Sequence, residues 1–364
     1  MSSHLPSTSP LWQRIGELGV RTLAVMGMSK NTGKTVCLNH LLTHAHRDRK
    51  AVGITSIGRD GEAHDEVFSI PKPPVMVTPG CLVATARGTL LRAKVRTKQM
   101  GATGVNSPMG EVLIVKALEA GEMEVAGPSR SHDQLKVMAL LRQCGAQWVF
   151  VDGALGRSQH ASPAIADGVV LATGAAIGGG VDDVLRKTHD RLAVLGIAPA
   201  SLDLAQQVKA TFDLGGIAAW GHRGECLFSE AVATINAAPV LLSLPATGIA
   251  TLAMSGAVGK RLWQAVQTLL VRHPGLTVVV ADGTKLFIDA LELAAFERQG
   301  GRLFALRGIR VLGITLNPFS PFGGSFDAAL FQARAREALS AHLVTDLMLA
   351  PLAVAPTAPQ MEGL

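Results

Sequence analysis

One short segment constrains the fold of this chain more than any other. Residues 22–26 (Thr-Leu-Ala-Val-Met) have the length and composition of a buried strand, and Gly27 ends it. The loop Gly27-Met-Ser-Lys-Asn-Thr-Gly33-Lys34-Thr35 follows, and residues 35–45 have the spacing of apolar positions that is typical of a helix. A strand that passes through a glycine loop into a helix predicts a sheet with crossover helices.

The same alternation continues along the chain and predicts an α/β fold. Strands are expected at residues 51–55, 112–115, 123–126, 147–152, 168–173, 251–255, 277–281 and 311–316. Helices are expected at residues 11–18, 131–143, 182–195 and 260–271. We therefore predict a mostly parallel, twisted sheet with helices on both faces and a C-terminal α/β extension. The expected parts are an N-terminal extension (1–18), a nucleotide-binding domain of P-loop type (19–200), a second α/β half or subdomain (201–349) and a flexible tail (350–364).

The glycine loop lies between a strand and a helix, which is the context that a phosphate-binding P-loop requires. Backbone N–H groups of Asn31 through Thr35 would converge on phosphate oxygens, and the helix N-terminus adds a positive dipole. Lys34 would reach the β- and γ-phosphates, and the Thr35 hydroxyl would bind Mg²⁺. The other loop residues expected to contact nucleotide are Gly27, Lys30, Thr32, Gly33 and Val36. An ordinary glycine-rich turn is the alternative.

The spacing in this loop carries a resemblance. Five residues, Met28 to Thr32, separate Gly27 from Gly33-Lys34, where four are usual. The loop resembles that of dethiobiotin synthetase, in the branch of P-loop proteins that includes MinD-type ATPases and cobyrinic acid amide synthases. Val149-Phe-Val-Asp152, with Gly156 four residues later, is similar to that branch's strand with an acid. The resemblance implies that Asp152 holds the water shell of Mg²⁺ and that Gly156 lies near the γ-phosphate; in the alternative, Asp152 caps a turn.

The loop after the second strand lies where this branch places its first switch. In Ser56-Ile-Gly-Arg59-Asp60-Gly-Glu62, Asp60 or Glu62 would orient an attacking water or bind the metal, and Arg59 would contact a phosphate. A solvated loop is the alternative. Lys34, Asp60 and Asp152 are the expected catalytic residues, and Thr35, Asp60 and Asp152 the expected metal ligands.

A third segment concerns the base of the nucleotide. The strand at residues 311–316 is followed by Asn317-Pro318, which resembles the segment in which an asparagine of this branch reads the adenine edge. Asn317 lies far beyond Asp152 along the chain. Thr173-Gly174, at the end of the strand that comes next after Asp152, competes for the same role.

Within the branch, four segments are similar to the ATPase subunit of the reactivating factor for B12-dependent lysine 5,6-aminomutase-type enzymes: residues 26–35, 57–62, 152–157 and 315–321. The resemblance implies an ATPase that needs ATP and Mg²⁺, turns over slowly alone, and acts with a MutS-like subunit to release damaged cobalamin from the aminomutase. The sequence has no Asp-x-His-x-x-Gly segment of its own. The alternatives are an ATP-dependent ligase or kinase that acts on a small carboxylate, and a nucleotide-binding regulatory protein with little turnover.

Composition and charge indicate which classes of partner the protein can bind and which cellular compartment suits it. The net charge of +6 raises the question of a nucleic-acid or membrane partner, but aromatic residues make up 4% of the chain and Tyr is absent, which disfavours stacking on bases. The uncharged run 231–259 contains prolines and glycines and predicts buried strands and turns. Four scattered cysteines and a polar N-terminus predict a cytoplasmic protein. The cations between Arg87 and Lys98 predict a solvated helix face, with an anion-binding patch as the alternative. An oligomer is compatible with all of this.

Overall fold

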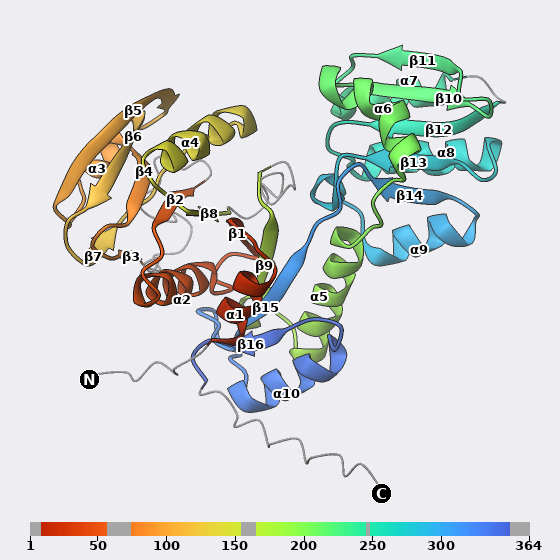
Figure 1. The fold of residues 1–364 in the computed structure, drawn as a ribbon. Helices are drawn as coiled ribbons and strands as arrows, with labels where there is room; N and C mark the ends of the chain where they lie inside the picture. The colour runs from red at the N-terminus through yellow and green to blue at the C-terminus, as the bar shows by residue number, and fades with distance from the viewer. Residues whose placement is uncertain (1–8, 57–73, 154–164, 245–247, 350–364) are drawn as a thin grey trace, which may run out of the picture.

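Apolar strands and amphipathic helices alternate to build a nine-stranded sheet that is parallel over most of its width (Figure 1). The computed structural model describes residues 9–56, 74–153, 165–244 and 248–349. In spatial order the strands are β16 (Val344–Asp346), β15 (Val311–Asn317), β9 (Gly168–Gly174), β1 (Thr22–Gly27), β8 (Trp148–Asp152), β2 (Val52–Ser56), β4 (Leu82–Ala86), β6 (Gly110–Ala117) and β5 (Thr97–Ser107). The pairs from β16 to β4 are parallel, whereas β6 is antiparallel to both of its neighbours. The prediction of an α/β fold with a large, mostly parallel sheet is confirmed.

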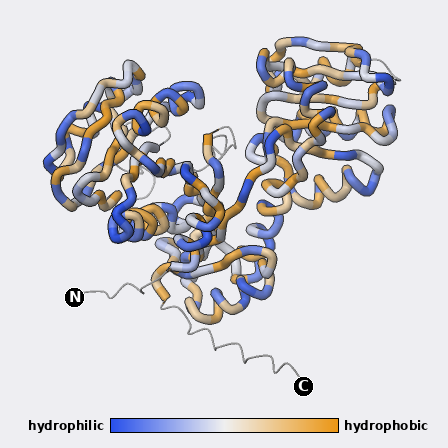
Figure 2. Tube along the Cα trace, in the orientation of Figure 1, coloured by the Kyte–Doolittle hydropathy of each residue, from blue (hydrophilic) through white to orange (hydrophobic). Residues whose placement is uncertain are grey.

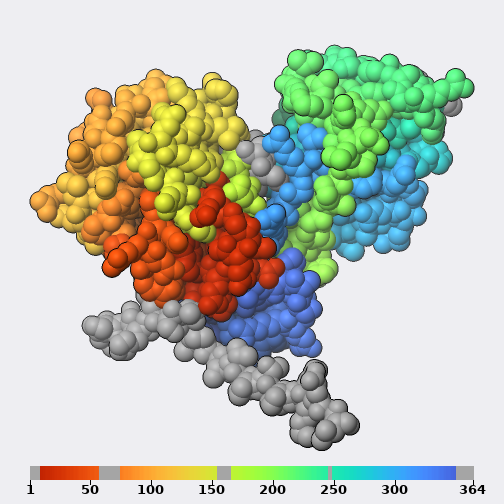
Figure 3. Space-filling model, in the orientation of Figure 1, coloured from red at the N-terminus to blue at the C-terminus, as the bar shows by residue number. Residues whose placement is uncertain are grey.

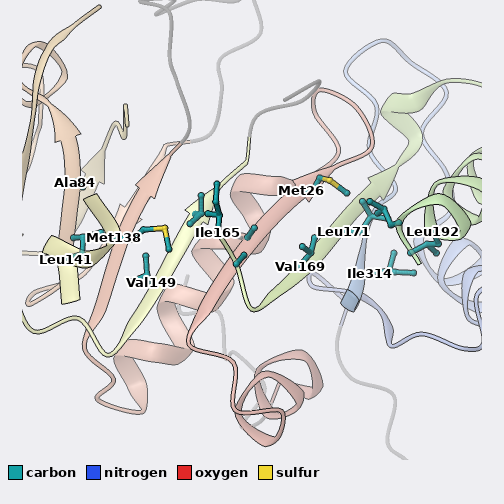
Figure 4. Close-up of a cluster of buried hydrophobic side chains, with 14 of the residues drawn as sticks. Met26, Ala84, Met138, Leu141, Val149, Ile165, Val169, Leu171, Leu192 and Ile314 are labelled. Carbon is teal, nitrogen blue, oxygen red and sulfur yellow. The ribbon is translucent and has the colours of Figure 1, made fainter. Parts of the chain in front are cut away.

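Helices cover both faces of this sheet, as predicted. One face packs against α4 (Ser131–Gln143), α5 (Val181–Leu195) and α10 (Ala328–Ala338). The other packs against α1 (Pro10–Glu17), α2 (Lys34–Arg47) and the small sheet of β3 (Val75–Val77) and β7 (Gly121–Met123). Because successive strand residues point to opposite faces, Ala24 and Met26 lie in the first core and Leu23 and Val25 in the second. Figure 4 shows the first core, where Met26, Leu171 and Ile314 come from neighbouring parallel strands.

A second sheet of five strands forms a separate mass (Figures 1 and 3). In spatial order its strands are β11 (Cys226–Glu230), β10 (Ile217–Gly221), β12 (Ile249–Met254), β13 (Thr277–Val280) and β14 (Arg302–Ala305). One face packs against α7 (Ala237–Leu242), α8 (Lys260–Arg272) and α9 (Ala290–Arg298), and the other against α6 (Leu202–Leu214). In Figure 2 the strands of both sheets carry long apolar stretches. The remaining short helices are α3 (Arg87–Leu90), η2 (Ala175–Ile177), η3 (Thr234–Asn236) and η4 (Gly283–Lys285).

The chain passes between the two sheets twice. Helix α5 packs Leu185 and Leu192 into the core of the first sheet, while Val194, in its last turn, belongs to the core of the second. The chain returns through β15, which pairs with β9 in the first sheet. Residues 311–346, which the sequence analysis grouped with residues 201–310, therefore contribute strands to the nine-stranded sheet.

Buried charges lie where α5 meets the second sheet. The Arg191 guanidinium donates to the carbonyl oxygen of Leu286 (3.2 Å), and burial lowers its pKa while the charge of Asp282 opposes that change. Burial also lowers the pKa of the Lys285 ammonium, and the charge of Asp282 again opposes that change. Asp282 is 1% exposed and accepts from the N–H of Thr284 (2.9 Å). Because charges are retained in an interior when they are paired, we assign this cluster to holding α5 against the second sheet.

The structure corrects two local predictions. The uncharged run 231–259 was expected to form strands and turns, but it contains η3 and α7 as well as β12. Pro239 is the third residue of α7, in the first turn, where its missing N–H has no intrahelical partner to lose. The strand expected at 123–126 lies earlier, at β7. In the described ranges no helix is both long and apolar enough to cross a membrane.

The cations between Arg87 and Lys98 do not form a helix face. Arg87 begins the short α3, and Lys98 lies on β5, with a loop between them. The loop cations lie beside carboxylates that follow β6 along the chain: Arg92 with Glu124 (3.0 Å), Lys94 with Glu122 (2.9 Å) and Arg96 with Glu119 (3.0 Å). This stretch is therefore locally neutralised, which corrects the prediction of a solvated helix face.

Two histidines where α2 meets α1 predict a pH dependence of stability. His40 Nε2 lies 2.8 Å from Ser9 Oγ, and burial, together with the positive charges of His44 and Arg47, lowers the pKa of His40 from 6.5 to about 4. Burial also lowers the pKa of His44, which is 1% exposed.

We expect the free energy of unfolding to fall as the pH drops from 6.5 toward 4, because the unfolded chain binds protons that the folded chain does not. Above pH 6.5 both states are neutral at these rings, and this contribution to stability is fully present. Urea unfolding at pH 7, 6 and 5 tests the sign. The variant His40→Gln should show a flatter dependence than the wild type, and equal slopes would contradict the assignment.

Candidate functional site

The glycine loop leaves the carboxyl end of β1, which lies between β8 and β9 in the first sheet. The ends of these parallel strands face the same edge, where open α/β sheets bind ligands. The loop is tied to one neighbour by the Met28 N–H, which donates to the Ala172 carbonyl on β9 (2.8 Å). On the other side, the N–H of Gly153 donates to the Val25 carbonyl (3.0 Å). The base of the loop is therefore held on both sides.

Two residues of the loop have left-handed backbone conformations. Asn31 has a φ of 61° and Gly33 a φ of 93°. Asparagine is one of the few residues other than glycine that adopts this conformation at low cost. Gly33 is the N-cap of α2 and has no side chain that caps the helix. The first N–H groups of α2 are therefore left without an intrahelical partner at this edge of the sheet.

Side chains of the loop fold back over Gly27. The Thr32 hydroxyl donates to the Ser29 carbonyl (2.9 Å), and Lys34 Nζ donates to the same oxygen (3.3 Å). A Cβ added to Gly27 would lie 2.7 Å from Thr32 Oγ1 and 2.8 Å from Lys34 Nζ. A side chain at position 27 would therefore displace Thr32 or the lysine ammonium from its place beside this residue.

The acidic residue next to the loop is Asp152, the last residue of β8. It lies beside Val25 of β1 and Ser56 of β2 in the parallel register, and it is 8% exposed. Burial raises the pKa of the Cys37 thiol, in α2, to about 12, and the negative charge of Asp152 adds to that rise. The carboxylate of Asp152 is therefore close enough to the first turn of α2 to act on the Cys37 thiol.

Asn317 is brought to the loop from 286 positions away along the chain. Its Nδ2 donates to the Asn31 carbonyl (2.8 Å), and its Oδ1 accepts from the Phe319 N–H (3.2 Å). A Cβ on Gly33 would lie 3.3 Å from Asn317 Cβ. The side chain thus fastens the end of β15 to the left-handed turn of the loop.

The two candidates for base contact are neighbours. Asn317 and Gly174 are partners in the parallel register of β15 and β9. A Cβ on Gly174 would lie 2.8 Å from the carbonyl carbon of Asn317 and even closer to its oxygen. Thr173 is fully buried, and its hydroxyl lies 2.7 Å from that of Thr188 in α5. Of the two, Asn317 is the residue whose side chain reaches the loop.

The remaining site residues predicted from the sequence differ in how exposed they are and in whether they lie at this edge of the sheet. Thr32 and Thr35 are 1% and 6% exposed, whereas Lys30 is exposed and Val36 is 36% exposed. Lys34, Thr35, Asp152 and Asn317 are brought to one edge of the sheet. Arg59, Asp60 and Gly156 lie outside the described residues.

Ser56 lies beside Asp152 in the parallel register but was not among the site residues predicted from the sequence. The Ser56 hydroxyl donates to the Val125 carbonyl (2.8 Å) and accepts from the Gly127 N–H (3.1 Å). A Cβ on Gly127 would overlap the Ser56 carbonyl. The segment before α4 thus crosses the end of β2. The Gly127-Pro128 pair just before a helix is a sequence signal for a close backbone approach, but nothing in the sequence indicates that Ser56 is the residue approached.

Two of the three predicted metal ligands, Thr35 and Asp152, lie at this edge of the sheet, and the third, Asp60, lies outside the described residues. In the described ranges no group of three or more His, Cys, Asp or Glu side chains has the arrangement to hold a metal ion. The Thr35 hydroxyl and the Asp152 carboxylate are hard oxygen donors. Mg²⁺ is commonly held by one or two protein oxygens together with waters and substrate phosphates. The donor set therefore fits a magnesium ion that arrives with a polyphosphate.

Replacing Asn317 with alanine tests its role in the loop. The change removes a donor to the Asn31 carbonyl and an acceptor for the Phe319 N–H, and we expect a loss of about 1–2 kcal/mol in the free energy of unfolding. Urea unfolding measures it. Asn317→Asp keeps the acceptor for the Phe319 N–H but places a carboxylate oxygen against the Asn31 carbonyl oxygen, so it should be at least as destabilised as the alanine variant. An alanine variant as stable as the wild type would contradict this role.

Comparison with the models of known families, with curated proteins and with solved structures found no match.

Proposed function

We propose that this protein is a P-loop ATPase that binds ATP with Mg²⁺ at the loop Gly27–Thr35 and uses hydrolysis to alter a partner enzyme. The observation that carries the proposal is the loop itself. It follows a strand inside a parallel sheet, has left-handed turns at Asn31 and Gly33, and holds the Lys34 ammonium where a Cβ on Gly27 would fill the space. Anionic oxygens are the ligands that such a set of donors favours.

The residues of the site fit the parts of a bound nucleotide. The backbone N–H groups at the start of α2 would hold phosphate oxygens, and Lys34 would neutralise the β- and γ-phosphates. Mg²⁺, when bound, would neutralise charge that develops on the phosphates, and Thr35 and Asp152 would hold it. Asn317 would hold the loop in shape and stands beside it for contact with the base. In this proposal the protein itself contributes positioning and fixed charge.

The coupling to a partner rests on the resemblance described above. By that resemblance the partner is a B12-dependent aminomutase, and a MutS-like subunit completes the reactivating factor. In this proposal the γ-phosphate distinguishes two states of the loop, and α5 relays the difference. Helix α5 starts beyond β9 and η2, is joined to Thr173 through Thr188, and ends in the core of the second sheet. A cytosolic location belongs to the same proposal.

Phosphate release tests the function directly. The purified protein should hydrolyse ATP slowly and should hydrolyse it faster when the aminomutase and the MutS-like subunit are added. A phosphorylated or ring-closed small product formed without a partner would instead identify a ligase or kinase. Stabilisation by ATP and Mg²⁺ without any phosphate release, with or without partners, would identify a passive binder. Either of the last two results would overturn the ATPase proposal while leaving the nucleotide site in place.

A further inference from the structure

A cavity of about 320 Å³ opens at the other end of α2, away from the glycine loop. Helix α2 has 14 residues, so its two ends lie about 20 Å apart. The cavity lies between the end of α2, the start of β2 and the turn before β4. Among the residues that line it are Leu42, His46, Arg49, Lys50, Thr78 and Cys81. Its volume falls in the range of small-molecule sites.

The lining divides into an apolar floor and a cationic rim. Leu42, Val52 and Cys81 are 3%, 5% and 5% exposed and form the buried side. His46, Arg49 and Lys50 are exposed and stand along one wall. Such a lining is complementary to a molecule with an apolar body and an anionic group.

Hydrogen bonds fix both walls of the cavity. Asn39 of α2 donates from Nδ2 to the Pro74 carbonyl (3.0 Å) and accepts at Oδ1 from the Met76 N–H (2.9 Å), which fastens β3 to the helix. Across the cavity, the Cys81 N–H donates to the Thr78 carbonyl (3.0 Å) and closes the turn. On the α2 side, the chain reverses at Arg49, which has a left-handed φ of 52°. A non-glycine residue held in this conformation indicates a backbone fixed by its surroundings.

Within the described part of the chain, the cations of the rim have no carboxylate partners. In residues 9–56, 74–153, 165–244 and 248–349, no carboxylate lies within ion-pair distance of Arg49, Lys50 or His46. Asp48 is adjacent in sequence, but it accepts from Trp12 Nε1 (2.7 Å) and pairs with Arg47 (3.0 Å). The dipole of α2 favours cations in its last turn, whereas Arg49 and Lys50 lie beyond the C-cap Asp48. The rim differs in this respect from residues 92–96, where Arg92, Lys94 and Arg96 each pair with a glutamate.

We propose that this cavity is a binding site for a small organic anion with a short apolar body, whose charged group lies against Arg49 and Lys50 and whose chain lies on Leu42, Val52 and Cys81. Arginine forms two parallel hydrogen bonds with a carboxylate or a phosphate. The apolar chain would gain free energy from burial on the floor. This site is independent of the nucleotide site.

Titration with sodium hexanoate, monitored by calorimetry, tests the site, with acetate and 1-hexanol as probes that carry only the charge or only the chain. We expect hexanoate to bind at least tenfold more tightly than either. A parallel titration with hexyl phosphate distinguishes a phosphate from a carboxylate as the preferred group. Wild type and Lys34→Ala should bind hexanoate equally, so this result does not depend on the nucleotide site.

Variants locate the binding. The double variant Arg49→Ala/Lys50→Ala should weaken hexanoate binding at least tenfold. The double variant Arg92→Ala/Lys94→Ala removes the same charge from the paired stretch and should leave the Kd unchanged. Thr78→Trp should block the cavity without changing its charge, and circular dichroism checks that each variant is folded. The proposal fails if hexanoate binds no more tightly than acetate and 1-hexanol, or if binding survives both the charge variant and the steric variant.

Discussion

Replacing Lys34 with alanine is expected to remove the stabilisation of this protein by ATP and Mg²⁺. The Lys34 ammonium lies over Gly27 at the mouth of the loop, 3.3 Å from the Ser29 carbonyl. A charge-assisted hydrogen bond to phosphate contributes about 1.5–3 kcal/mol, which corresponds to a loss of roughly 10- to 150-fold in affinity. At a ligand concentration a few times the wild-type Kd, the melting temperature should therefore rise with ATP and Mg²⁺ in the wild type and stay nearly unchanged in the variant.

A matched control separates loss of the site from loss of a surface charge. Lys136 is an exposed lysine of α4, and Lys136→Ala removes the same charge from another element. This control should respond to ATP as the wild type does. Nucleotide stabilisation that is unchanged in Lys34→Ala would show that the loop is not the binding site.

The second large effect concerns packing beneath the loop. Gly174→Ala would place a Cβ 2.8 Å from the Asn317 carbonyl carbon and closer still to its oxygen. Both residues belong to paired strands, so the strands must separate or the pairing must shift. We expect a loss on the order of 3 kcal/mol in the free energy of unfolding. Because Asn317 also holds Asn31, the variant should in addition bind ATP more weakly.

Urea unfolding of Gly174→Ala and Gly180→Ala measures this effect. Gly180 has nothing within 4 Å of an added Cβ, and its φ of −83° suits any residue. The control should therefore be as stable as the wild type. If Gly174→Ala unfolds at the same urea concentration as the control, this result would contradict the close approach of β9 to β15 at Gly174.

The sequence predicted the strands and helices around the site because their patterns are local. The expected strand at residues 22–26 is β1, the helix at 131–143 is α4, and the strand at 311–316 is β15 with one residue added. The two strands are apolar runs that end at Gly27 and Asn317, and the helix has apolar residues at helical spacing. No helix or strand with stated bounds was predicted between residues 201 and 250, although Ser201 caps the start of α6 and Gly215 follows its end. The edge strand β11 is mostly exposed and has no alternation of buried and exposed residues.

The parts of the site that depend on pairing between distant segments were not predictable. Asn317 was predicted as a site residue from the Asn317-Pro318 motif. Its hydrogen bond to the Asn31 carbonyl, however, depends on β15 returning to the first sheet. The contact between Ser56 and Gly127 has the same origin, since it joins residues 71 positions apart. The glutamates that neutralise Arg92, Lys94 and Arg96 lie in and around β7, 23 or more positions further along the chain. A periodic pattern indicates a strand and its buried face, but it does not indicate the neighbour of that strand.

Hydrogen–deuterium exchange with and without ATP and Mg²⁺ tests the central claim most directly, because it locates the ligand without any substitution. In the proposed complex, phosphate oxygens would accept from the backbone N–H groups of residues 31–35, at and just before the start of α2. We predict slower exchange with ATP and Mg²⁺ in peptides that cover residues 27–37, and in the peptide that contains Asn317. No change in exchange at residues 27–37 at a saturating ATP concentration would contradict the account.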